Sequence, residues 1–159
     1  MNAAKILFPT DLSTLGQTAL EMATDLASQR GAKLLIMHVV EPPLAYGGGE
    51  FCDGIPEPDR DEIQRMLTAV LPADPAVGYE HRLMIGNPAT AIVDLAEKEH
   101  VDMIVMSTHG RTGLLRLLGS VAEEVVRKAN CPVLTVKAAV PAKAKAKAAA
   151  KAQAALAFN

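Results

Sequence analysis

Five short apolar runs alternate with helical segments along the chain, and this order constrains the fold more than any other feature. The runs cover residues 5–9, 33–40, 77–85, 101–106 and 132–136. Their length and their β-branched residues predict strands. Between them, the spacing of apolar residues predicts helices over residues 13–29, 59–71, 88–100 and 120–128. The order predicts an α/β, doubly wound domain with a mostly parallel sheet and helices on both faces.

Capping residues mark where these helices begin and end. Ser13 is placed to cap the first helix, and Gly31 to end it. Asn87-Pro88 supplies the third helix with a cap and with a proline at its first position. The run from Lys33 to Val40 is apolar nearly throughout, which is typical of a strand covered on both faces.

Length and composition indicate one domain with an aliphatic core. The chain has 159 residues, of which five are Phe or Tyr and none is Trp. No apolar run approaches the roughly 20 residues of a membrane span, and the N-terminus lacks the pattern of a signal peptide. Cys52 and Cys131 form no CxxC motif and indicate no disulfide framework. We therefore expect a cytoplasmic protein with no membrane partner.

Charge divides the chain into a body, residues 1–137, and an Ala/Lys-rich, low-complexity tail, residues 138–159. All 18 acidic residues lie before residue 136, together with 11 of the 16 basic ones, so that region carries a net charge of −7. An acidic body makes nucleic acid an unlikely partner. The tail has no apolar stripe that could dock it, so we expect a solvated extension; weak attraction of its lysines to anionic surfaces is the alternative.

A glycine-rich loop follows the fourth predicted strand. Residues 107–113 read STHGRTG, and Gly119-Ser120 begins the next helix. Glycines let backbone N–H groups approach an anion, and a helix start adds unpaired donors and partial positive charge. His109 and Arg111 flank Gly110 and could pair with phosphate oxygens. Glycine and serine also punctuate ordinary loops and cap helices, so both interpretations stay open.

The predicted topology brings this loop next to a second polar segment. Thr10-Asp11 follows the first strand, and ligands of doubly wound sheets bind beyond the carboxyl ends of strands, where the strand order reverses. Both segments fall at that edge, which is the strongest physical argument for a site. As an alternative, Asp11 is an ordinary turn residue.

Motifs of several enzyme classes are absent from the sequence. It contains no GxxxxGK[ST], no GxGxxG and no GxSxG, and it offers no obvious catalytic base. Glu97 and His100 have a spacing that can ligate a metal, but no second such pair accompanies them. His38 and His81, both in predicted strands, are expected to be structural. We predict no metal site and no catalytic residues.

Several of these segments resemble the universal stress protein family. Gly110, Gly119 and Ser120 match its G-x-x-G, nine residues, G-S/T signature, with the wording THGRTG and GSVAEEV around them. Pro9-Thr10-Asp11-Leu12-Ser13 matches its PTDxS start, and NCPVLTVK resembles its last strand. Ser107 stands where the first glycine of the signature belongs, and eight residues rather than nine separate Gly110 from Gly119.

The resemblance implies a Rossmann-like five-stranded parallel sheet of order 3-2-1-4-5 that binds ATP, with or without Mg or Mn. It implies a stress-response sensor or regulator rather than an enzyme, with an interaction module that binds no nucleotide and a slow ATP hydrolase as alternatives. A homodimer through strand five is expected, from the apolar edge formed by Val133, Leu134 and Val136. The implied ligand residues are Pro9, Thr10, Asp11, Val39, Met106, Ser107, His109, Gly110, Arg111, Thr112, Gly113, Gly119, Ser120 and Val121.

Overall fold

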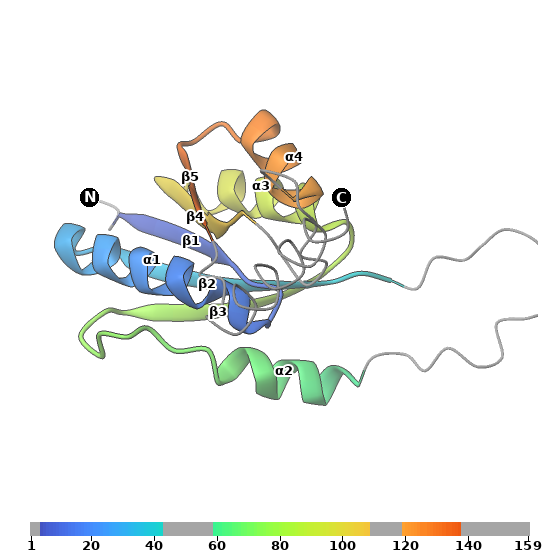
Figure 1. Ribbon diagram of the computed structural model, residues 1–159, viewed down its shortest axis with the longest axis horizontal. Coiled ribbons are helices and arrows are strands. Elements are labelled where there is room, and N and C mark those ends of the chain that lie inside the picture. The colour runs from blue at the N-terminus through green and yellow to red at the C-terminus, as the bar shows by residue number, and fades with distance from the viewer. Residues whose placement is uncertain (1–3, 43–58, 109–118, 138–159) are drawn as a thin grey trace, which may run out of the picture.

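A computed structural model describes residues 4–42, 59–108 and 119–137 of the chain. Within these ranges the strands and helices alternate as the sequence predicts (Figure 1). The strands are β1 (Lys5–Pro9), β2 (Lys33–Val40), β3 (Tyr79–Ile85), β4 (Met103–Ser107) and β5 (Val133–Val136). The helices are the short 3-10 turn η1 (Thr14–Gly16), α1 (Gln17–Arg30), α2 (Arg60–Thr68), α3 (Pro88–Lys98) and α4 (Ser120–Lys128).

The five strands form one parallel sheet of order β3-β2-β1-β4-β5, which confirms the predicted fold. After β1 the chain adds β2 and β3 on one side and then β4 and β5 on the other. The strand order therefore reverses between β1 and β4. In sheets of this type the carboxyl ends of those two strands border the crevice where ligands bind.

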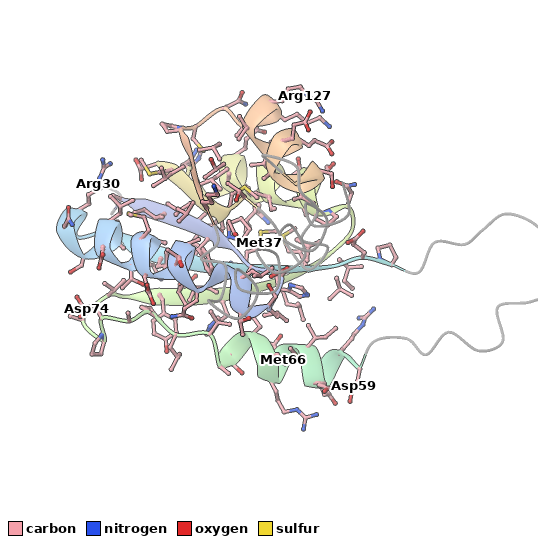
Figure 2. The ribbon with its side chains drawn as sticks, in the orientation of Figure 1. Arg30, Met37, Asp59, Met66, Asp74 and Arg127 are labelled. Carbon is pink, nitrogen blue, oxygen red and sulfur yellow. The ribbon has the colours of Figure 1, made fainter. Side chains whose placement is uncertain are left out.

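Two hydrophobic cores lie on opposite faces of the sheet, each between the sheet and the helices that cover that face (Figure 1). On one face, Leu7, Met37 and Ile104 pack with residues of α3 and α4. On the other, Phe8, Ile36 and Val105 pack with α1 and with Leu67 of α2. Met37 lies inside the sandwich, whereas the side chains of Arg30 and Arg127 project outward (Figure 2). Alternate residues of each strand thus face opposite cores, as the pleat requires.

The first helix begins later than the sequence predicts. The predicted cap, Ser13, precedes η1 and makes no side-chain capping bond; α1 starts at Gln17 with Gly16 as its N-cap. The reason is local competition: both the backbone N–H and the hydroxyl of Ser13 donate to Asp11 Oδ1, at 3.0 and 2.7 Å. Ser13 therefore stabilises the preceding turn and is not available to cap the helix.

No helix among the described residues is long and apolar enough to cross a membrane. The tail, residues 138–159, lies outside the described residues.

Candidate functional site

The segment after β1 is held at the carboxyl edge of the sheet. The backbone N–H of Thr10 donates to the Met37 oxygen at 2.8 Å, which extends the pairing of β1 with β2 by one step. On the other side, β1 pairs with β4 at an offset that places Thr10 level with Ser107. Pro9, Thr10 and Asp11 thus stand at the point where the strand order reverses, as the sequence predicts.

A tight turn follows, and side-chain hydrogen bonds hold it. The Thr10 hydroxyl oxygen accepts the Leu12 N–H at 3.0 Å, and Asp11 Oδ1 accepts both donors of Ser13. Leu12 has φ 63°, a left-handed conformation that costs a branched residue about 1–2 kcal/mol. These bonds offset that cost and fix where the half-buried Asp11 side chain lies.

His38 of β2 fastens the same turn from the neighbouring strand. Its Nδ1 lies 2.8 Å from the Thr10 backbone oxygen. A carbonyl oxygen can only accept a hydrogen bond, so Nδ1 carries the proton and donates it. His81 makes an equivalent contact elsewhere, with Nε2 2.8 Å from the Val70 oxygen. Both histidines therefore hold backbone segments in place. The resemblance to the family selects Val39 as a ligand residue. The hydrogen bond between its neighbour His38 and Thr10 is seen only in the fold.

The end of β4 forms the second half of the site. Met106 and Ser107 are its last residues, and Thr108 follows as a buried residue that sequence reasoning did not select. The Thr108 N–H donates to the Val136 oxygen at 2.9 Å, and its oxygen accepts the Gly119 N–H at 2.7 Å. Thr108 therefore joins the end of β4 to both β5 and the start of α4. His109, Gly110, Arg111, Thr112 and Gly113 lie outside the described residues.

The start of α4 has the properties of an anion site. Gly119 is its N-cap, in an extended conformation with φ −71° and ψ 158°, and as a glycine it has no side chain with which to cap the helix. Ser120 and Val121 are the first two helical residues. The leading N–H groups of a helix have no partner within it, and they carry the positive end of the helix dipole. The Thr108–Gly119 bond directs this end toward the carboxyl edge of the sheet.

Val39 and Met106 form part of the core that lies between the sheet and the α3–α4 layer. Their side chains are 9% and 5% exposed, and Val121 of α4 packs against the same cluster. Each lies near the carboxyl end of its strand. The three residues thus bring apolar side chains to the carboxyl edge of the sheet, on its α4 side.

Among the described residues, no group of three or more His, Cys, Asp or Glu side chains could hold a metal ion. Glu97 and His100, which have metal-ligand spacing, sit at the opposite end of the domain. There the Glu97 carboxylate accepts a hydrogen bond from Asn130.

Comparison with known proteins identifies the relatives of this chain. Residues 3–137 match the model of the universal stress protein family. A universal stress protein of Methanocaldococcus jannaschii is 38% identical over 138 residues, covering 84% of this chain and 81% of the relative. A universal stress protein solved in complex with cAMP superposes with a TM-score of 0.60 at 25% identity, over 87% of this chain and all of the other.

A universal stress protein of Archaeoglobus fulgidus solved with dAMP has a TM-score of 0.59, also at 25% identity. The superposition covers 86% of this chain and all of the other. The family model covers most of the chain, and the fold is the same. The chain therefore belongs to the universal stress protein family.

Proposed function

We propose that this protein binds ATP at the carboxyl edge of the sheet and acts as a sensor or regulator in a stress response. One observation carries the proposal. The hydrogen bond from Gly119 N–H to Thr108 O positions the start of α4, which has a glycine as its N-cap, beside the end of β4, at the reversal of strand order. The two related structures solved with cAMP and dAMP support an adenine nucleotide as the ligand.

The phosphates belong at the start of α4. Backbone donors of Ser120 and Val121 suit phosphate oxygens, because a helix N-terminus offers both hydrogen bonds and positive potential; the N–H of Gly119 is used by the bond to Thr108. A glycine at the cap lets the anion approach the backbone closely. The bond between Thr108 and Gly119 joins the two described residues on either side of residues 109–118.

The adenosine belongs in the crevice between β1 and β4. Val39 and Met106 offer an apolar surface for the adenine ring, and the Asp11 carboxylate can accept hydrogen bonds from ribose or adenine donors. Pro9, Thr10 and Ser107 border the same crevice from the ends of the two strands. A Mg or Mn ion would arrive with the triphosphate and be held mainly by its oxygens.

A regulatory role is the better match to these groups than a catalytic one. Asp11 Oδ1 is engaged by Ser13, and His38 Nδ1 by the Thr10 oxygen. Both side chains thus shape the turn. The proposed output is a change in partner binding when ATP is bound, which fits a protein that works as a homodimer in the cytoplasm.

The dimer would form through β5. In a parallel pair, the N–H and C=O of one residue point to the same side of the strand. Pro132 and Val136 accept hydrogen bonds from the β4 side, so Val133 and Thr135 direct their backbone groups away from it. Leu134 of β5 and Val126 of α4 are 36% and 47% exposed. A second copy of β5 would satisfy the open edge and cover these side chains.

Mass spectrometry of small molecules released from the purified full-length protein tests the function most simply. An adenine nucleotide at near-stoichiometric amount, with ATP binding confirmed by calorimetry, is the expected result. Protein that carries no nucleotide and shows no heat with ATP would contradict the proposal. That result would favour an interaction module.

A further inference from the structure

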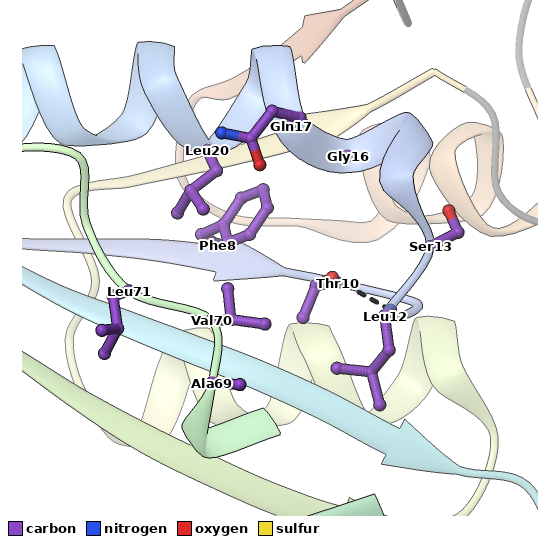
Figure 3. Close-up of a pocket in the computed structure, with 10 residues that line it drawn as sticks. All are labelled: Phe8, Thr10, Leu12, Ser13, Gly16, Gln17, Leu20, Ala69, Val70 and Leu71. Carbon is purple, nitrogen blue, oxygen red and sulfur yellow. Dashed lines mark hydrogen bonds between the residues drawn. The ribbon is translucent and has the colours of Figure 1, made fainter. Parts of the chain in front are cut away.

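A cavity lies behind the turn that follows β1, on the α1–α2 face of the sheet. Its volume is about 240 Å³. Figure 3 shows Phe8 rising from β1 toward Leu20 of α1, with Val70 and Leu71 closing the cavity from the segment after α2. Val39 and Met106 belong to the core on the other face. The cavity is therefore separated by the sheet from the apolar part of the proposed ATP site.

Missing side-chain volume creates the cavity. Gly16 is buried in its wall, and a Cβ there would lie 3.7 Å from Phe8 Cζ and 3.9 Å from Thr10 Oγ1. Both are ordinary contact distances, so the wall has room for a methyl group. Gly16 has φ −79° and ψ −7°, a conformation open to any residue. Across the cavity, Ala69 contributes only a methyl group (Figure 3).

The lining restricts what could bind. Phe8, Leu20, Val70 and Leu71 provide apolar contact, and none of the described lining residues carries a charge. Polar side-chain atoms come from Thr10, Ser13 and Gln17, and the Ser13 hydroxyl already donates to Asp11 Oδ1. The Thr10 hydroxyl oxygen accepts the Leu12 N–H, which leaves its own proton to donate. Gln17 donates from Nε2 to Glu21, and its amide oxygen remains an acceptor toward the cavity (Figure 3).

We propose that this cavity binds a small uncharged molecule with an apolar body and one hydroxyl group. An apolar cavity of about 150 Å³ is enough to hold benzene, so the larger volume here admits an aromatic or cyclic alcohol. The hydroxyl would bond the Thr10 and Gln17 oxygens, and the ring would lie against Phe8 and Leu20. The described lining offers no cation that could pair with an anionic ligand. The inference goes beyond ATP binding and does not depend on it.

The probe for the test is benzyl alcohol, titrated into the full-length protein without nucleotide and followed by two-dimensional ¹H–¹⁵N NMR. We expect saturable shifts centred on the amides of Gly16, Gln17 and Leu71. Benzoate and benzylamine have the same ring but carry a charge at neutral pH. They should bind at least about tenfold more weakly, because burying an unpaired charge is costly.

Two variants and one matched control complete the test. Gly16→Ala and Ala69→Leu each fill part of the cavity and should weaken benzyl alcohol binding at least about fivefold. Ala73→Leu adds the same side chain at an exposed position outside the lining and should leave it unchanged. Ala69 is exposed at the end of α2, so this variant is informative even where Gly16→Ala impairs folding.

Non-saturating shifts, shifts centred on Val39 and Met106, or unchanged affinity in both filling variants would overturn the proposal. ATP titration of the same samples is read separately. A protein that fails to bind benzyl alcohol but binds ATP refutes only the second site, and the reverse result refutes only the nucleotide proposal.

Discussion

The imidazole Nδ1 of His38 lies 2.8 Å from the backbone oxygen of Thr10 and ties β2 to the turn that carries Asp11. This bond spans 28 positions in the sequence. His38 therefore positions Asp11 without being part of the proposed ligand contacts.

Replacing His38 by alanine should weaken ATP binding by about three- to tenfold, because the turn loses one of the bonds that position Asp11. His38→Asn should retain most of the affinity, since its amide can donate from a similar place. Calorimetric titration with ATP provides the measurement. His81→Ala is the matched control, because His81 bonds the Val70 oxygen on the α2 side. Equal losses in His38→Ala and His81→Ala would argue against a positioning role.

Alternating charges connect three strands at the opposite end of the sheet. The Glu99 carboxylate accepts a hydrogen bond from Lys5 at 2.7 Å and lies 3.6 Å from the Arg82 guanidinium. The Glu80 carboxylate forms ion pairs with Arg82, at 2.5 Å, and with Lys33. The hydrogen bond from Lys5 holds the pKa of Glu99 below its ordinary value of 4.5. The pKa of Glu80 is also lowered, mainly by its hydrogen bond with Lys33 and next by its hydrogen bond with Arg82. These partly exposed groups link β1, β2 and β3 with the segment after α3.

Glu99→Gln should lower the melting temperature at neutral pH by about 2–4 °C. A carboxyl group whose pKa is lowered by folding stabilises the fold above its unfolded pKa and loses that contribution as the pH falls. The difference between variant and parent should therefore shrink from about pH 5 downward. Asp94→Asn, on the exposed side of α3, is the control in thermal scans from pH 7 to pH 3. A difference that stays constant over this range would contradict the charge network.

Proline substitution tests the proposed β5 dimer. Val133→Pro removes a donor that points away from β4, so it should shift the dimer toward monomer in light scattering at micromolar concentration without breaking the sheet. Ile85→Pro makes the same change at the other edge. At that edge the Gly78 oxygen and the Gly86 N–H form hydrogen bonds with β2, so the backbone N–H of Ile85 points away from β2. A monomeric parent, or equal effects at both edges, would refute a dimer through β5.

Much of the fold could be predicted because its signals are local. Asn87 caps α3 by accepting the Thr90 N–H, and Gly31 ends α1 in a left-handed conformation, as their residue types indicate. The end of α3 is harder to read. His100 takes the left-handed position that glycine usually fills, with φ 52°, while Val101 bonds back to the Ala96 oxygen. The next strand consequently begins at Met103 rather than at Val101.

The candidate site was predictable in part for a different reason. Thr10, Asp11, Ser107 and Gly119 each follow or precede a predicted element, so topology alone brings them to one edge. The features that hold these residues in place are of two kinds: contacts between residues far apart in sequence, and backbone conformations that the residue type does not favour. The His38–Thr10 bond is of the first kind, and the left-handed Leu12 is of the second. Neither leaves a periodic or compositional signal, because each depends on how the strands are paired.

The most direct test of the ATP site is calorimetric titration of ATP and adenosine into the parent and Gly119→Val. The branched side chain should block the approach of the triphosphate to the start of α4 and lower ATP affinity at least about tenfold, while adenosine binding changes little. Gly119→Ser, which keeps a small residue at the cap, serves as the matched control for helix stability. Unchanged ATP affinity in a folded Gly119→Val protein would contradict the proposal that the phosphates bind at this helix.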